Sequence, residues 1–299
     1  MASVAASPRQ LSAHAVRRYG AVLGYAGDAV LEAWCGPSRV KQRLLRAYCR
    51  WFGYPELAAH RRYSLVCQAL SGRGGSQIVD VGARNGLYIL ADALRHPERR
   101  YAAVDISRGH MRRVRLAAEH FGVRILPLTS RAEALALPSE SADLVLTIEV
   151  LQFVEDDRLA TSEIGRILRP GGIWWCEQEL HSAGRPTRPG EDPTLAKRRL
   201  GHSVNRLSDL ARAAGMNLVE TRPVDGAIGR WWEGLEARIH RWGAGLHLIA
   251  FPALRALSSL TASRWTDFSP STLLYCFEKQ PQSDMVPAPG ERDPGRQTV

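Results

Sequence analysis

The chain has 299 residues, of which 45% are hydrophobic and 23% charged, so a mainly disordered chain is excluded. Its five cysteines are odd in number and lack a C-x-x-C pair, which argues against a disulfide framework and a zinc site and favours a reducing compartment. The formal net charge is +10, with most of the excess in residues 1–75, a distribution that can attract nucleic acid, an anionic membrane or an acidic substrate.

Residues 1–68 are predicted to form an N-terminal helical cap, because the pattern from His14 to Cys67 is helical with breaks near 36–37 and 53–55. The first residues are rich in Ala, Ser and Arg and contain no acid before Asp28, which is also typical of an organelle transit peptide. We favour a bacterial N-terminus followed by a basic helix, and therefore a cytoplasmic protein, over that alternative.

A strand, a glycine turn and a helix follow one another over residues 77–94, which read QIVDVGARNGLYILADAL. At such a turn the backbone can approach a ligand closely, and the new helix offers unpaired N–H groups. A second apolar run ends in Asp105, where a carboxylate can hold a ribose diol. Arg84 replaces the middle glycine of G-x-G-x-x-G, so pyrophosphate is not favoured and the segment indicates a nucleoside-binding β-α-β unit.

Strands and helices alternate through the rest of the chain, which predicts a mainly parallel sheet covered on both faces. Ligands of such sheets bind at the carboxyl ends of the strands, where we expect Asp80, Asp105 and Glu149. The predicted strands lie near 77–81, 101–105, 123–127, 143–148, 172–178, 217–223 and 271–278, and the predicted helices near 86–95, 108–121, 156–168 and 203–214.

Four motifs occur in a fixed order: the glycine turn at 80–86, Asp105, the segment 131–156 and the stretch ILRPGGIWW at 167–175. With these motifs the chain resembles the class I S-adenosylmethionine-dependent methyltransferases over roughly residues 63–280. The resemblance implies an α/β Rossmann-like fold with a seven-stranded, mainly parallel sheet whose last strand is antiparallel. It also implies a methyltransferase domain over 69–280, with a helical insertion at 226–268 between strands six and seven.

S-adenosyl-L-methionine is the cofactor that this resemblance implies. In the family the acidic residue of the first strand lies near the amino-acid end of the cofactor, which corresponds to Asp80, and the one ending the second strand holds the ribose, which corresponds to Asp105. The chain departs from the family's usual residues at Arg84 and Arg131. The candidate cofactor-binding residues are Asp80, Gly82, Ala83, Arg84, Gly86, Asp105, Ile106, Arg131, Ala132 and Glu149.

The candidate catalytic residues are His181 and Glu149, because they follow the ends of the predicted fifth and fourth strands and either can act as a base. A surface histidine without a catalytic role is the alternative for His181, and His202 is a further candidate. In the cap, Tyr19, Tyr25, Tyr54 and His60 are candidates for substrate contact or for the core. No metal site is expected.

Residues 226–268 place apolar side chains on one helical face, with arginines around it and Gly243 and Gly245 as a hinge. A helical pair packed on the sheet edge, a lid over an apolar acceptor and a helix at a membrane interface all fit this pattern. Residues 281–299 are predicted to be a disordered tail. The residues of the face are Trp231, Leu235, Ile239, Trp242, Leu246, Ile249, Leu254, Leu257 and Leu260.

The hypothesis that joins these observations is a methyltransferase acting on a small or lipid-like apolar acceptor, such as a natural product or a lipid or glycan intermediate. A non-catalytic cofactor-binding or scaffold protein of the same fold is the first alternative. An RNA methyltransferase that uses the basic N-terminal region is the second, and we regard a nucleic-acid partner as the weaker hypothesis. Peripheral membrane contact through 226–268 stays open.

Overall fold

The computed structural model describes residues 38–72, 75–179, 204–261, 270 and 272–281. Its helices are α3 (Arg39–Phe52), α4 (Leu57–Gly72), α5 (Leu87–Ala93), α6 (Arg108–Phe121), α7 (Asp157–Ile167), α8 (Val204–Ala213), α9 (Ala227–Trp242) and α10 (Ala244–Leu260). Its strands are β1 (Gln77–Val81), β2 (Arg100–Asp105), β3 (Ile125–Thr129), β4 (Ala142–Ile148), β5 (Leu168–Glu179), β6 (Met216–Pro223) and β7 (Thr272–Lys279).

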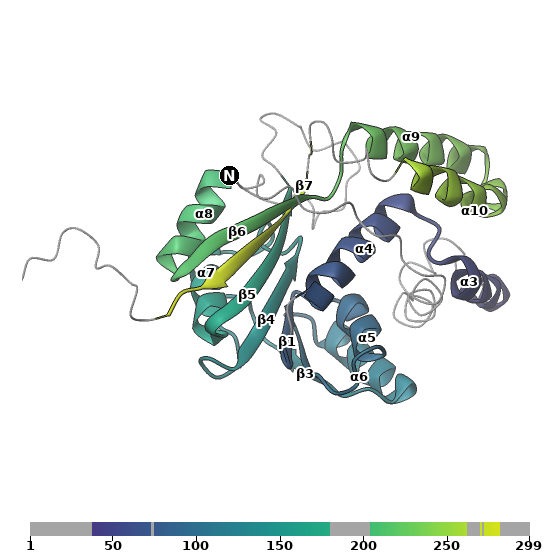
Figure 1. Cartoon of the computed structure of the whole chain (residues 1–299). Helices are drawn as coiled ribbons and strands as arrows, with labels where there is room; N and C mark the ends of the chain where they lie inside the picture. The colour runs from purple at the N-terminus through teal and green to yellow at the C-terminus, as the bar shows by residue number, and fades with distance from the viewer. Residues whose placement is uncertain (1–37, 73–74, 180–203, 262–269, 271, 282–299) are drawn as a thin grey trace, which may run out of the picture.

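The strands form one twisted sheet in the order β3-β2-β1-β4-β5-β7-β6 (Figure 1). Neighbours from β3 to β5 pair in parallel, whereas β7 runs antiparallel to both β5 and β6. The predicted fold class is therefore confirmed. The order in which successive strands are added to the sheet reverses between β1 and β4, and at such a switch point the carboxyl ends of the strands leave a crevice for a ligand.

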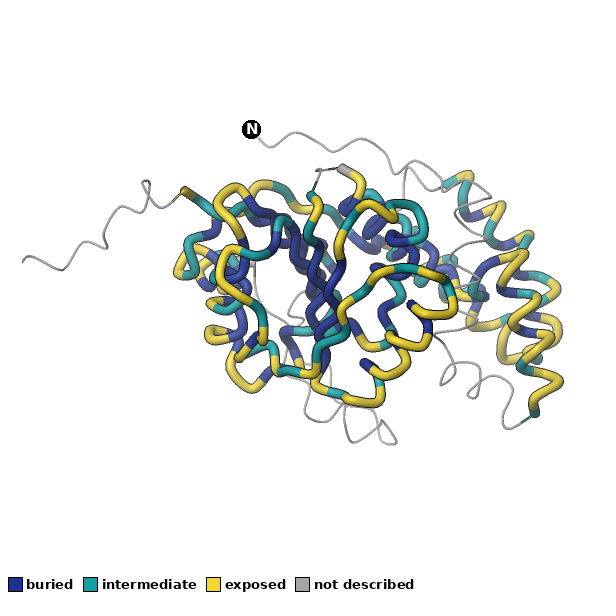
Figure 2. Tube along the Cα trace, turned by 90° about the horizontal axis from the view of Figure 1, so that it is seen from below, coloured by how far each residue is buried: buried dark blue, intermediate teal, exposed yellow. Residues whose placement is uncertain are grey.

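The sheet is buried on both faces because successive side chains of its strands point to opposite sides. Trp174 packs in one core cluster with residues of α7 and α8, and the next residue, Trp175, packs in another with residues of α4, α5 and α6. Figure 2 shows the strands as the buried centre of the molecule. The run of three buried apolar residues in β4, Leu144, Val145 and Leu146, follows from this double burial.

Two predicted strand limits are corrected by the structure. The third strand begins at Ile125 rather than at residue 123, because Gly122 caps α6 in the left-handed region and the N–H of Val123 still bonds to the carbonyl of Ala118. The fifth strand already begins at Leu168, which pairs with Ala142 before the register shifts across the predicted turn.

Helices α3, α4, α9 and α10 lie together at one end of the molecule, to the right of the sheet in Figure 1. Helix α9 packs against α4 and α10, and Tyr48 of α3 donates a 2.7 Å hydrogen bond to the carbonyl of Leu248. The predicted hinge lies at Gly243, where φ is +139°, whereas Gly245 falls inside α10. Of the described helices, none is long and apolar enough to span a bilayer.

The predicted limits of the cap and of the methyltransferase domain stay predictions. Helices α3 and α4 precede β1, and α9 and α10 stand between β6 and β7, as the fold class requires. The predicted transit-peptide or flexible segment and nearly all of the predicted disordered tail lie outside the described residues.

Candidate functional site

The turn after β1 brings the backbone of two strands together. The N–H groups of Gly82 and Ala83 donate to the carbonyl of Val104, at 2.7 and 3.0 Å. Gly82 has a φ of +74°, and a Cβ atom there would overlap the side chain of Val150. Arg84 is also left-handed, with φ +48°, and its backbone N–H donates to Asp105. The turn is thus close-packed, and only glycine fits its first position.

Asp105 ends β2 with a carboxylate held in one orientation. Its Oδ2 accepts the N–H of Arg84 at 2.9 Å, and its Oδ1 accepts the N–H of Ser107 at 2.8 Å. The ring Nδ1 of His110 lies 3.2 Å from the same Oδ1. Because an ionised carboxylate has about four acceptor positions, capacity remains for a ligand hydroxyl.

Asp80 lies in β1 with its side chain buried and its Oδ2 without a hydrogen-bond partner among the described residues. Burial, with a smaller contribution from Asp105, raises the pKa of Asp80 from 3.8 to about 8. A buried carboxylate of this kind is stabilised in its ionised form by a cation placed beside it. The site therefore fits a ligand that carries an ammonium group.

A cavity of about 570 Å³ opens at the carboxyl ends of β1, β2 and β4. Asp80, Ala83 and Gly86 do not line it, and all three are buried around the turn. A second cavity of about 700 Å³ lies at the opposite ends of the strands and contains none of the predicted site residues. The predicted cofactor residues that line the first cavity are Gly82, Arg84, Asp105, Ile106, Arg131, Ala132 and Glu149.

The cavity wall beyond Asp105 combines apolar and charged groups. Ile106 and Phe153 are both exposed and line the cavity, so they can cover an aromatic ring. Arg131 lines the same wall, but its guanidinium bonds to Glu155 at 2.7 Å and to Glu133 at 3.3 Å. The positive charge of Arg131 is therefore balanced within the protein.

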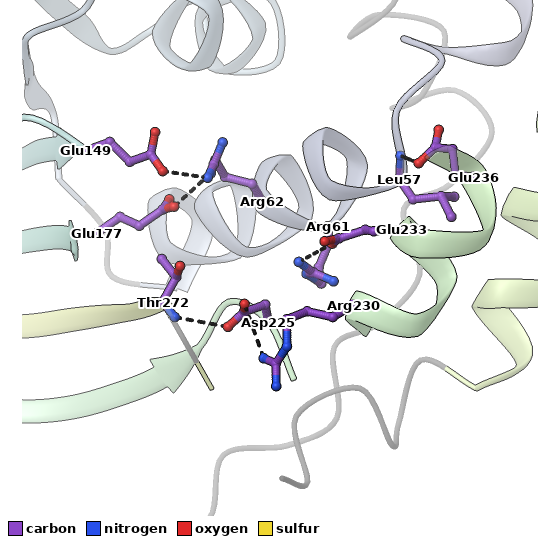
Figure 3. A network of polar contacts seen from close by, with 10 residues as sticks. All are labelled: Leu57, Arg61, Arg62, Glu149, Glu177, Asp225, Arg230, Glu233, Glu236 and Thr272. Atoms are coloured by element: carbon purple, nitrogen blue, oxygen red, sulfur yellow. Dashed lines mark hydrogen bonds and ion pairs between the residues drawn. The ribbon is translucent and has the colours of Figure 1, made fainter. Parts of the chain in front are cut away.

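Glu149 belongs to a cluster of charged groups that joins α4 to the sheet (Figure 3). Arg62 of α4 donates from Nη2 to Glu149 at 2.9 Å and from Nε to Glu177 of β5 at 2.7 Å. Glu149 itself has a φ of +55°, and its N–H bonds to the carbonyl of Glu177 at 3.2 Å. Such strain in a non-glycine residue persists where the surroundings hold it, commonly at functional sites.

Glu177 is a second buried carboxylate, and its Oε2 has no partner among the described residues. Burial raises the pKa of Glu177 to about 7 although Arg62 opposes the shift. Sequence reasoning did not find Glu177 or Arg62, because they come from elements far apart in the chain. The one available signal was the pair Arg61-Arg62 within an otherwise largely apolar helix.

The same helix is also tied to α9, on its other side (Figure 3). Arg61 pairs with Glu233 at 2.6 Å, and the backbone N–H of Leu57 donates to Glu236 at 3.0 Å. The other carboxylate oxygen of Glu236 lies 3.0 Å from Nε2 of His247 in α10. Helix α4 therefore lies between the ligand edge of the sheet and the α9–α10 hairpin.

Several predicted residues lie away from the cavity or outside the described residues. His181, His202, Tyr19 and Tyr25 fall in the second group. His60 is buried, with Nε2 2.7 Å from the carbonyl of Tyr54, and burial lowers its pKa to about 3. Neither His60 nor Tyr54 lines the cavity. Within the described part of the chain, no cluster of three His, Cys, Asp or Glu side chains is placed to hold a metal.

Comparison with known proteins agrees with this geometry. A family model described as a methyltransferase domain matches residues 79–176, which run from β1 into β5. A ubiquinone biosynthesis O-methyltransferase of Dinoroseobacter shibae is 33% identical over 102 residues, which cover 34% of this chain and 40% of that protein. The chain thus matches less than half the length of that curated relative.

Solved structures share the fold at low identity. A geranyl diphosphate methyltransferase, in complex with GPP and sinefungin, superposes with a TM-score of 0.54 at 12% identity and covers 73% of this chain and 76% of its own. The [4+2]-cyclase SpnF gives a TM-score of 0.51 at 20% identity, over 74% and 81% of the two chains. At these identities the likeness concerns the fold alone.

Proposed function

We propose, on the premise that residues 79–176 match a methyltransferase domain, that the protein uses S-adenosylmethionine to methylate a small or lipid-like, fairly apolar acceptor. The observation that carries the proposal is the buried carboxylate of Asp80, whose Oδ2 has no hydrogen-bond partner among the described residues. It lies in the strand that leads into the turn at Gly82, and Gly82 and Asp105 line the cavity at the switch point of the sheet. When bound, S-adenosylmethionine supplies a methyl group activated by the sulfonium charge.

The residues around the turn fit this cofactor group by group. Asp80 would hold the ammonium group of the cofactor, Asp105 would accept a ribose hydroxyl, and Gly82 would allow the backbone to approach the ligand closely. Ile106 and Phe153 provide the apolar wall for a purine ring. Arg131, balanced by two glutamates, adds no uncompensated charge to that wall.

The protein's part in an in-line methyl transfer is to hold the acceptor nucleophile in line with the methyl carbon and to exclude water. Helix α4, fixed by Arg62 to Glu149 and Glu177, stands at the edge where the acceptor must approach. An arrangement of several elements fixed by ion pairs suits this positioning role.

An oxygen acceptor must also lose a proton, and a positioned base contributes typically 10²–10⁴-fold. The curated relative's name specifies O-methylation, which supports an oxygen acceptor here. Glu149 lines the cavity and remains our candidate base beside His181, and the neighbouring Glu177, whose pKa is raised to about 7, is a third candidate.

Calorimetric titration of the full chain with S-adenosylmethionine and with its demethylated product tests the proposal. We expect micromolar binding, weakened at least about tenfold in Asp105→Asn, because a hydrogen bond to a charged group contributes about 1.5–3 kcal/mol. Asp209→Asn is the matched control, since Asp209 is an exposed carboxylate on α8 that pairs only with Arg212 among the contacts seen.

Two results would contradict the proposal. Absence of binding by a folded wild-type protein would favour the non-catalytic alternative. Equal weakening by Asp105→Asn and Asp209→Asn would show that binding does not use the turn after β1. Methyl transfer to lipid-soluble phenols and hydroxy acids, followed by mass spectrometry, then identifies the acceptor class.

A further inference from the structure

The α9–α10 hairpin leaves one face of each helix exposed. In α10 the exposed apolar residues recur at intervals of three and four, which places them in one stripe along the helix. Ile249 and Leu260 have 80% and 77% of their surface exposed, and the stripe contains no charged residue. Its members are Leu246, Ile249, Ala253, Ala256, Leu257 and Leu260.

The outer face of α9 has a different composition from that stripe. Trp231 and Trp242 are exposed there, at 61% and 78%, and Arg238 and Arg241 lie between them on the same face. Tryptophan and arginine together are typical of helices at the boundary between water and lipid headgroups. Figure 2 shows exposed stretches of chain at this end of the molecule.

Charge is segregated across the hairpin. Both acidic residues of α9 point inward, where Glu233 pairs with Arg61 and Glu236 bonds to Leu57 and His247. The exposed charges of α9 are Arg238 and Arg241. The inward side is therefore acidic and tied to α4, and the outward side carries cations beside an apolar stripe.

Helix α3, next to α10, repeats the pattern. It contains five cations and no acidic residue. Its buried residues are Leu45 and Cys49, whereas Val40 and Leu44 form part of a separate apolar stripe that is about two-thirds exposed. We call the outer sides of α3, α9 and α10 together the helical platform.

We propose that the helical platform docks on an anionic lipid bilayer, with the apolar stripes in the interfacial layer and the surrounding arginines and lysine at the headgroups. The helices lie on the surface rather than cross it, since no described helix meets the requirements of a membrane span. The proposal does not depend on the methyl-transfer reaction.

Charge complementarity favours a bilayer over a second copy of the chain. A two-fold dimer through the platform would oppose the same patch on both subunits, and thus bring like cations together around the stripes. An anionic surface instead attracts each nearby Lys or Arg by about 1 kcal/mol, which corresponds to about fivefold in binding per cation.

Co-sedimentation of the full chain with vesicles tests this proposal. We expect binding to vesicles containing 30% phosphatidylglycerol, weaker binding to pure phosphatidylcholine, and loss of the difference at about 1 M salt. The chain has eight tryptophans. A blue shift of tryptophan emission on binding, with quenching by brominated acyl chains, that is lost when both Trp231 and Trp242 are replaced by Phe would place these two side chains in the interface.

Matched variants assign the binding to the stripe. Leu257→Asp should weaken vesicle binding about tenfold or more, because a side chain that enters the apolar layer is replaced by a charge. Leu159→Asp on α7 is the control, since Leu159 and Leu257 are helical leucines with the same exposure, 52%. Arg238→Glu with Arg241→Glu should remove most of the preference for anionic vesicles.

Three outcomes would overturn the proposal. One is absence of binding to either kind of vesicle. Another is equal loss of binding in Leu257→Asp and Leu159→Asp. A third is a concentration-dependent dimer, seen by analytical ultracentrifugation, that Leu257→Asp disrupts while vesicle binding stays unchanged, since the platform would then be an interface between copies.

Discussion

Asp80 and Glu177 are two buried carboxylates at the same edge of the sheet, and they differ in what neutralises them. Burial raises the pKa of both, to about 8 and about 7. Glu177 has a cation within the protein, Arg62 at 2.7 Å, whereas Asp80 forms no ion pair with any residue that the structure describes. We therefore expect Asp80 to bind a cationic ligand, whereas Glu177 holds α4 in place through Arg62.

The substitution Asp80→Asn tests the role of Asp80 and should have the largest effect. We expect cofactor affinity to fall about 100-fold, because the amide cannot pair with an ammonium group, whereas stability at pH 7 is kept or increased. Calorimetry and thermal unfolding measure the two effects. As a control, Asp143→Asn should cost stability without affecting affinity, since Asp143 accepts backbone N–H groups at the other end of β4. Unchanged affinity in Asp80→Asn would make Asp80 structural.

Removal of the Arg62 guanidinium tests whether this cation stabilises the buried Glu177. Arg62→Met should lower the free energy of unfolding by about 2 kcal/mol at pH 8, because Glu149 and Glu177 are left without a partner. The loss should be smaller at pH 6, where Glu177 takes up a proton. Chemical denaturation at both pH values measures this.

The double variant Arg62→Met with Glu177→Gln is the matched control for that experiment. It removes the buried charge together with its partner, so part of the stability lost in Arg62→Met should return. Strict additivity of the single changes would show that Arg62 and Glu177 do not interact energetically.

The smallest expected effect is the release of a proton from Asp80 when the cofactor binds. Below pH 8 the unliganded Asp80 is mainly protonated, and a cation bound beside it lowers its pKa, so cofactor binding at pH 7 should release up to one proton. Affinity should therefore rise between pH 6 and pH 8. Calorimetric titrations in buffers of different ionisation enthalpy measure the number of protons released. If Asp80→Asn released the same number, Asp80 would not be the source of the proton.

In contrast to the affinity, the contribution of Asp80 to the stability of the unliganded protein should fall as the pH rises. A folded-state pKa raised from 3.8 to about 8 means that the folded protein binds the proton more tightly than the unfolded chain. The contribution of Asp80 is thus fully present below pH 4 and is lost as the pH rises toward 8.

Local chain segments explain how much of the site could be predicted. The turn at 82–86 and Asp105 belong to one β-α-β unit, so their residue types and spacing already indicated a nucleoside site. The mainly parallel sheet followed from the alternation of strands and helices, and the antiparallel last strand followed from the family resemblance. Arg62 and Glu177 meet only because α4 crosses the ends of β4 and β5, and no local pattern records that contact.

The hairpin shows a second limit. The sequence pattern placed one apolar face over residues 231–260, and periodicity alone does not tell a face that packs from a face that docks. In the structure Leu254 of that face is buried, whereas Ile249 and Leu260 are exposed. The break at Gly243 changes which side chains share a face, and the packing of α9 against α4 and α10 then decides which are covered.

Neighbouring arginines on α4 have a consequence for the molecule as a whole. Arg61 is tied to α9 and Arg62 to the ends of β4 and β5, and both belong to one rigid helix. The hairpin cannot shift relative to the sheet without breaking one of these ties or moving α4. If a surface displaces α9 so that α4 moves with it, the affinity for a ligand at the sheet edge changes, and by thermodynamic reciprocity that ligand changes the affinity for the surface by the same factor.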